Sequence, residues 1–144
     1  MKIDNVSKSD HQTLLIIWEA SVRATHDFIT EQYIAEIKPL ILAQYFDAVD
    51  LRCVKDDNGT ILGFCGVAEQ NIEMLFVAPQ HAGKGVGTQL TCYAIEKLAA
   101  YKVDVNEQNP QALGFYQHMG FEVVSRSATD DQGKPYPLLH MKLR

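Results

Sequence analysis

The chain has 144 residues, of which 47% are hydrophobic and 22% charged, and its formal net charge is −5. This length fits one domain covering residues 1–144, and this composition is that of a globular protein with enough apolar side chains for a core. The acidic balance argues against nucleic acid as the main partner, because phosphate binding relies on a basic face.

Neither a signal peptide nor a membrane span is expected, because residues 1–15 lack a central apolar stretch and no apolar run approaches about 18 residues. The three cysteines, Cys53, Cys65 and Cys92, are odd in number and widely spaced, without a CxxC pair. They predict no disulfide framework and no zinc site, and they favour the reducing cytoplasm. No set of His, Cys, Asp and Glu has metal-ligand spacing, so no metal and no membrane partner are expected.

The first part of the chain predicts one short strand and two helices. Residues 1–4 read as the strand. The segment Ser7-Lys8-Ser9-Asp10 matches a helix-capping pattern, and apolar residues at helical spacing follow it to Thr25. Thr30 begins a second helix, in which Pro39 predicts a kink or a break.

The middle of the chain predicts three strands and a helix. Residues 51–56 and 61–70 flank Asp57-Asn58-Gly59, a turn signal, and therefore read as a hairpin. Residues 72–78 form the next strand. Strict alternation along it would put Glu73 on the face opposite Ile72 and Met74. Residues 86–100 form a helix.

The last third predicts strand, helix, strand and strand. Residues 103–106 read as a short buried strand. Asn109 and Pro110 are a helix start, and Gly120 is the expected cap at the end of a helix that reaches Met119. Residues 121–128 and 137–143 close the chain as strands. This mixture of helices and strands indicates an α/β or α+β fold with a mixed sheet.

Three glycines, Gly83, Gly85 and Gly87, separate the strand at 72–78 from the helix at 86–100. Glycine is a poor residue for a helix start, but it lets the backbone approach a ligand without a Cβ in the way. Free N–H groups and the helix dipole converge at such a turn, so the segment predicts an anion site.

Several patterns compete for this loop. A P-loop needs GK followed by Ser or Thr, which is absent, and a dinucleotide fingerprint needs GxGxxG directly after the strand, whereas the spacing here is GxGxG. The pattern Gln/Arg-x-x-Gly-x-Gly/Ala, starting at Gln80, fits. A glycine-rich turn that serves tight packing alone is the remaining alternative.

Two stretches resemble the motifs of the GNAT family of N-acetyltransferases. LFVAPQHAGKGVGTQLTCYAIE, residues 75–96, is similar to the acetyl-CoA motif of that family. NEQNPQALGFYQHMGFE, residues 106–122, is similar to its second motif at the usual separation. Residues 21–28, 105–116 and 133–139 further resemble one bacterial subgroup of the family. The resemblance covers nearly the whole chain.

The resemblance implies a single domain with about seven mostly antiparallel strands, about four flanking helices, and a splay between the fourth strand, 72–78, and the fifth, 103–106. It implies acetyl-CoA as the co-substrate, with its pyrophosphate on the glycine loop and its amide-rich arm along the strand edge. The implied coenzyme residues are Leu75, Phe76, Val77, Gln80, Ala82, Gly83, Lys84, Gly85, Val86, Gly87, Thr88, Asn106, Asn109 and Phe115. Lys84 has an equal alternative as a solvated lysine, and Asn109 as a helix cap.

Acetyl transfer to an amine requires a base for the amine, a donor for the thioester oxygen and an acid for the departing thiolate. The resemblance implies Tyr116 as the acid, since a tyrosine is protonated at pH 7; a packing role is the alternative. Backbone N–H groups near Leu75 or Phe76 are the implied oxygen donors. Glu73 is the preferred base, with a solvated surface charge as the alternative.

His26 is a second candidate base, and Asp27 beside it is a candidate partner for a cationic amine. His26, Asp27, Phe28 and Tyr136 are the expected acceptor-site residues, with His140 a further candidate contact; each also fits a surface or packing role. His81 and His118 read as surface residues.

The expected activity is N-acetyl transfer from acetyl-CoA to a primary amine by direct attack in a ternary complex. A cysteine-based route is disfavoured, because no cysteine falls at an active-site position of the two motifs. The acceptor stays open between a small molecule and a protein amine, and a homodimer is possible. The alternative is a non-catalytic acyl-CoA sensing or binding module, which would not need Tyr116.

Overall fold

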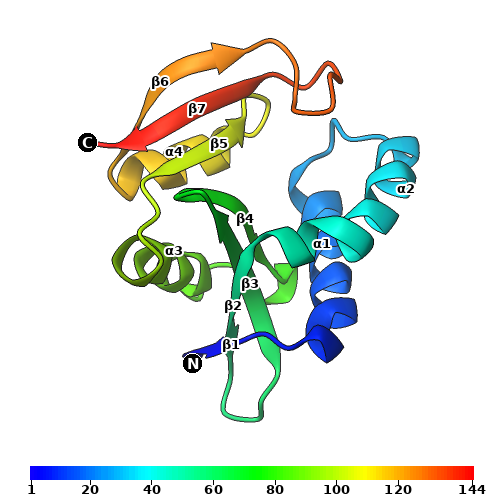
Figure 1. Cartoon of the computed structure of the whole chain (residues 1–144), viewed down its shortest axis with the longest axis vertical. Helices are drawn as coiled ribbons and strands as arrows, with labels where there is room; N and C mark the ends of the chain where they lie inside the picture. Colours follow the sequence, from blue (N-terminus) through cyan, green and yellow to red (C-terminus); the bar gives the residue numbers. More distant parts are fainter.

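A seven-stranded sheet in the order β1-β2-β3-β4-β5-β7-β6 runs through the molecule, with helices on both of its faces (Figure 1). The computed structural model describes all 144 residues. The strands are β1 (Lys2–Asn5), β2 (Asp50–Lys55), β3 (Ile61–Ala68), β4 (Asn71–Val77), β5 (Lys102–Asn106), β6 (Phe121–Ser127) and β7 (Leu138–Leu143). The α-helices are α1 (His11–Thr25), α2 (Glu31–Leu40), α3 (Val86–Lys97) and α4 (Pro110–His118). The predicted α/β class, the seven strands and the four helices are confirmed.

The sheet is divided where β4 meets β5. Every neighbouring pair of strands is antiparallel except β4 and β5, which run parallel. They pair only through Asn71 with Lys102 and Ile72 with Val103, and beyond these residues they separate. The predicted splay between the fourth and fifth strands is therefore present, and Figure 1 shows the two halves of the sheet diverging there.

The helices cover the two faces of the sheet in pairs. α1 and α2 bury one core cluster with β3 and β4, in which Trp18, Ile37 and Phe64 are buried. α3 and α4 pack on the opposite face, where Leu90 and Phe121 are completely buried. None of the helices is long and apolar enough to span a membrane.

A β-bulge at Glu73 corrects the expected alternation along β4. Gly66 on β3 pairs with Met74 and Val67 pairs with Ile72, so Glu73 is the extra residue between them. Ile72 consequently packs into the core on the α3 and α4 face, whereas Met74 packs against the α1 and α2 core. The two side chains expected on one face lie on opposite faces, because a bulge shifts the two-residue period by one.

The helix ends largely follow the predicted signals. The Ser7 N–H donates to the Asp10 carboxylate at 3.0 Å, and the Thr30 hydroxyl accepts from the Tyr33 N–H at 3.1 Å. α2 ends one residue after Pro39 and continues as a π-helical turn over Ile41–Tyr45. A proline lacks the N–H of a regular helical hydrogen bond, which accounts for this break.

Two later helices end slightly before their expected limits. α3 stops at Lys97 rather than at residue 100, because Ala99 takes a left-handed φ of +59° and the Ala100 N–H bonds back to the Ala94 carbonyl at 3.0 Å. α4 stops at His118, and Gly120 follows it with φ +103°, as expected of a helix-ending glycine.

Candidate active site

A cleft of about 680 Å³ lies where β4 and β5 separate. Its walls come from the two strands, the glycine loop, the start of α3, the inner side of α4 and the end of α1. The lining residues from the predicted site are His26, Glu73, Leu75, Phe76, Val77, Ala82, Gly83, Gly85, Val86, Gly87, Thr88, Asn106, Asn109, Phe115 and Tyr116. The fold thus gathers residues from five elements around one cavity.

The glycine loop takes backbone conformations that favour glycine. Gly83 has φ +80° and Gly85 has φ +83°, and a Cβ built on either would meet no atom within 4 Å. The glycines are therefore not there to allow close packing of the protein on itself, which removes the packing alternative for these two positions. Gly85 is the N-cap of α3 and offers no capping side chain, so the first N–H groups of the helix stay available to an anion.

Two residues expected at the coenzyme, Gln80 and Lys84, do not line the cleft. Both are exposed, and the Lys84 amine instead lies 3.1 Å from His81 Nδ1. His81, expected on the surface, is half-buried and does line the cleft. The loop therefore turns the backbone inward and the lysine outward.

Two asparagines at the end of β5 have different bonding. The side-chain oxygen of Asn109 accepts from the Ala112 N–H at 3.2 Å, so the predicted cap of α4 is confirmed. The side-chain oxygen of Asn106 is buried and has no hydrogen-bond partner. An unpaired buried polar atom is costly, so its place in the cleft wall fits a ligand that supplies an N–H group, as the amides of the pantetheine arm would.

Tyr116 is buried on α4 and lines the cleft. Its ring packs edge-on against Phe115 at 5.2 Å and against Phe121 at 5.6 Å. Burial raises the pKa of its hydroxyl well above the usual range, with the nearby Cys65 adding to the effect. The hydroxyl is therefore protonated at neutral pH and can donate a proton or a hydrogen bond.

A second, polar cavity of about 430 Å³ shares Glu73 and Asp104 with the cleft. Its other titratable residues are Glu69, Asp131, His140, Lys102 and Lys142. Burial raises the pKa of Glu73, a hydrogen bond from Asn71 opposes this, and the charges of Asp104, Asp131 and Glu69 raise it further. Carboxylates outnumber lysines around this cavity, and Glu73 is a better proton acceptor than an isolated glutamate.

His26 is the one predicted acceptor-site residue that lines the cleft; Asp27, Phe28 and Tyr136 do not. Phe28 and Tyr136 nevertheless form an aromatic row behind His26. The His26 and Phe28 rings lie 5.4 Å apart, and the Phe28 and Tyr136 rings 6.0 Å apart. Tyr136 belongs to the β6–β7 loop, whose Asp130 receives a hydrogen bond from Tyr33 of α2 at 3.4 Å.

Sequence reasoning missed the contribution of Asp104 and the full environment of His140. Asp104 lies 2.6 Å from His140 Nδ1, and Ser127 Oγ lies 2.6 Å from His140 Nε2. The alternation of VDVN, residues 103–106, is the sequence signal for this position of Asp104. Val103 and Val105 are buried, so the side chain of Asp104 between them must point to the opposite face of the sheet. Nowhere do three or more His, Cys, Asp or Glu side chains form a metal-binding group.

Comparisons with known proteins agree with this geometry. Residues 22–144 match the family model of the acetyltransferase (GNAT) domain. The peptidyl-lysine N-acetyltransferase YjaB of Salmonella typhimurium is 39% identical over 140 residues, covering 95% of this chain and 96% of its own. The apo solution structure of YjaB from Escherichia coli superposes with a TM-score of 0.86 at 36% identity, covering 98% of this chain and 95% of its own.

A more distant structure shares the fold. PaiA N-acetyltransferase from Thermoplasma acidophilum, solved in complex with coenzyme A, has a TM-score of 0.74 at 20% identity and covers 99% of this chain and 98% of its own. The bacterial subgroup whose stretches this sequence resembles is that of YjaB.

Proposed function

Since this chain belongs to the GNAT family of acetyltransferases, we propose that it moves the acetyl group of acetyl-CoA to the side-chain amine of a lysine in a protein. The lysine acceptor is supported by two YjaB relatives, both peptidyl-lysine N-acetyltransferases, at 39% and 37% identity. The activity of those proteins supports the acceptor class and leaves the target protein open.

The observation that carries the proposal is the junction between the cleft and the polar cavity, around which carboxylates outnumber lysines. The cleft is bordered by apolar β4 residues and the glycine loop, and it meets the polar cavity at Glu73 and Asp104. An ammonium group is attracted by ionised carboxylates, and a long lysine side chain can carry it from a protein surface into such a mouth. The geometry thus suits a cationic acceptor on one side and an anionic coenzyme on the other.

The residues around the loop suit the coenzyme. The N–H groups at the start of α3, from about Ala82 to Thr88, would hold the pyrophosphate. The edge of β4 beyond Ile72 is not paired with β5 and would receive the amide-rich arm as an added strand, with Asn106 as a side-chain partner.

When bound, acetyl-CoA supplies an activated acetyl thioester. Glu73 would take a proton from the incoming amine, helped by its raised pKa. Tyr116 would protonate the departing thiolate, since its raised pKa keeps the hydroxyl protonated until the thiolate forms. The proposed route is direct attack within a ternary complex, and it is supported by the cleft lining, which includes none of Cys53, Cys65 and Cys92.

The test is acetylation of peptides with purified protein and acetyl-CoA, read by thiol release and by the mass of the product. We expect addition of one acetyl group to the lysine of an Nα-blocked peptide, and none to the same peptide with arginine in its place. Thiol release with free diamines but with no peptide would contradict the protein acceptor. Saturable acetyl-CoA binding without transfer to any amine would instead favour the binding-module alternative.

A further inference from the structure

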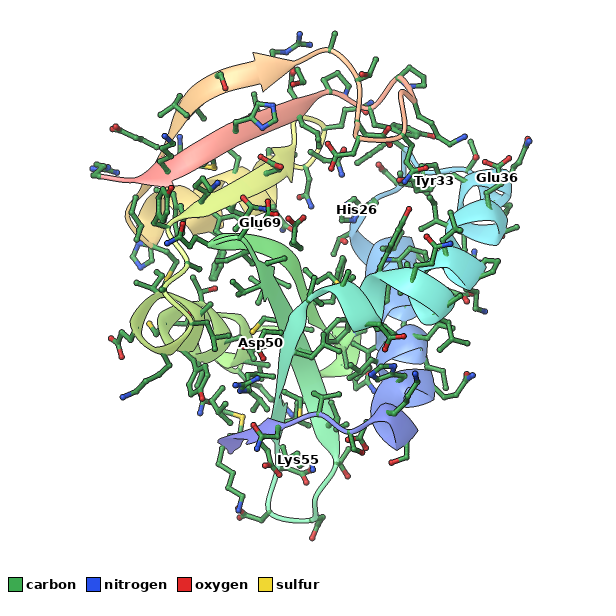
Figure 2. All side chains as sticks on the ribbon, viewed as in Figure 1. His26, Tyr33, Glu36, Asp50, Lys55 and Glu69 are labelled. Atoms are coloured by element: carbon green, nitrogen blue, oxygen red, sulfur yellow. The ribbon has the colours of Figure 1, made fainter.

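His26 lies at the end of α1, where the helix delivers it to the cleft wall opposite the splayed strands. Its backbone N–H donates to the Val22 carbonyl at 2.8 Å and closes the last turn of α1. The side chain is half-buried and lines the cleft together with Thr25. Figure 2 shows His26 at the end of α1, on the side of the helix that faces the sheet.

The neighbouring hydrogen bonds determine which nitrogen of the His26 ring carries the proton. The Thr25 hydroxyl lies 2.7 Å from the Ser21 carbonyl, and a carbonyl oxygen can only accept. The single hydroxyl proton of Thr25 is therefore used, and toward His26 Nδ1, also 2.7 Å away, Thr25 Oγ1 can only accept. Nδ1 must then be the protonated nitrogen, which leaves Nε2 of the neutral ring with a free lone pair.

The surroundings of His26 keep the ring neutral. Burial lowers the pKa of His26 and is the only cause of that shift. Four other titratable residues line the same cleft: Glu73 on β4, Asp104 on β5, Tyr116 on α4 and His81 before α3. Two more lie near the His26 ring: Asp27 is the next residue in the chain, and Tyr136 packs behind Phe28. The ring is therefore unprotonated at Nε2 at physiological pH.

We propose that His26 is a catalytic residue in which Nε2 accepts a proton from the attacking lysine nitrogen. The proposal rests on the proposed function and adds a second base to it. A lysine ammonium loses two protons when it becomes an acetamide: one ends on the coenzyme thiol and one is released to solvent. The reaction therefore uses two proton acceptors. Glu73 accepts the first proton, from the lysine ammonium, and His26 accepts the second, from the lysine nitrogen as the C–N bond forms.

The side chains of the protein account for every proton that is transferred. His26 receives one proton at Nε2 as the new C–N bond forms and the C–S bond breaks, and Tyr116 gives its proton to the thiolate sulfur. The His26 imidazolium and the Glu73 carboxylic acid then hold two protons; one restores Tyr116 and the other leaves to solvent. Phe28, packed 5.4 Å from the imidazole, holds the ring in place through this cycle.

The first experiment reads the free protein by ¹⁵N NMR of the histidine rings. We expect His26 to be protonated at Nδ1 and unprotonated at Nε2 at pH 7, with a pKa below the usual 6.5. Thr25→Val removes the hydroxyl acceptor and should shift the ring toward the Nε2–H form, whereas Thr25→Ser should preserve the wild-type signals. A wild-type ring protonated at Nε2 would overturn the proposal.

The second experiment measures kcat/KM against pH with a lysine peptide. His26→Gln keeps a polar group of similar reach but cannot titrate, and we expect kcat/KM to fall about 100-fold, within the usual effect of a positioned base. The acid-side inflection at the pKa found for His26 should vanish, and Thr25→Val should lose less activity than His26→Gln. Calorimetry should show unchanged acetyl-CoA affinity.

The outcomes separate the two proposals. A wild-type protein that binds acetyl-CoA but acetylates no peptide would refute the proposed function and this role together. An active wild-type protein whose His26→Gln variant keeps its rate and its acid-side inflection would refute only the role of His26.

Discussion

Glu73 and Asp104 directly follow the last residue pair that joins β4 and β5. Ile72 pairs with Val103, and the next residue on each strand is one of these two carboxylates. Both line the cleft and the polar cavity beside it. Beyond them the strands diverge, so the acidic pair marks the corner at which the acceptor would enter.

The charge of Asp104 contributes to the raised pKa of Glu73, after the larger effect of burial. Removing that charge should therefore lower the pKa of Glu73, and we expect Asp104→Asn to move the midpoint of the Glu73 carboxyl titration to lower pH. The measurement is the ¹³C shift of the Glu73 side-chain carboxyl across pH 3 to 8. Asp131→Asn should act in the same direction, because Asp131 also raises this pKa. A midpoint that does not move in either variant would contradict the coupling.

Tyr116→Phe should separate catalysis from stability. The hydroxyl of Tyr116 forms no hydrogen bond with the protein, and the ring packs between Phe115 and Phe121. We expect the variant to melt at the wild-type temperature or above it, because no buried partner loses its bond. Turnover should fall about 100-fold or more, as is usual for a lost general acid.

The matched control for Tyr116→Phe is acetyl-CoA affinity by calorimetry, which should stay within a factor of two of wild type. Retained turnover would remove Tyr116 as the acid. A loss of turnover with a parallel loss of affinity would instead assign the residue to coenzyme packing.

Local signals were sufficient for most elements of the fold. Thr30 and Asn109 predict the starts of their helices, because the side-chain oxygen of each accepts from an N–H group only three residues away. Gly120 predicts the end of α4, because the residue after the C-cap of the helix takes a positive φ, which glycine adopts easily. The glycine loop was recognisable as an anion site from its residues, whereas the cleft residues near Tyr116 were expected only from the resemblance to the GNAT motifs.

Features that depend on how strands far apart in the sequence pair with each other could not be predicted from local signals. The bulge at Glu73 arises from the pairing of β4 with β3, so strict alternation placed Ile72 and Met74 wrongly. The approach of Asp104 to Glu73 depends on a parallel pairing of two residues across a helical crossover. The fixed tautomer of His26 depends on where one hydroxyl proton goes, which a sequence does not specify.

Gly85→Asp should weaken both the fold and the binding of acetyl-CoA. The left-handed φ of +83° makes any side chain there strained by about 1–2 kcal/mol, although an added Cβ would touch no other atom. The carboxylate would also repel a pyrophosphate at the start of α3. Binding measured by calorimetry should fall by at least tenfold. Equal affinity in the variant would refute the phosphate cradle.

Gly114→Ala is the matched control for the loop substitution. Gly114 lies within α4, has an ordinary φ, and a Cβ there would also meet nothing within 4 Å. Alanine in a helix interior is favoured over glycine by about 1 kcal/mol, so this variant should be slightly more stable and should bind acetyl-CoA as the wild type does.

Asn106→Ala and Asn109→Ala should have opposite effects. Asn106 has a buried oxygen without a partner, so its removal should leave the free protein equally or more stable while acetyl-CoA binding weakens. Asn109 caps α4, so its removal should cost about 0.5–2 kcal/mol of unfolding free energy. Paired measurements of chemical unfolding and acetyl-CoA affinity on both variants test this. A destabilised Asn106→Ala protein with unchanged affinity would show that Asn106 serves the fold and not the coenzyme.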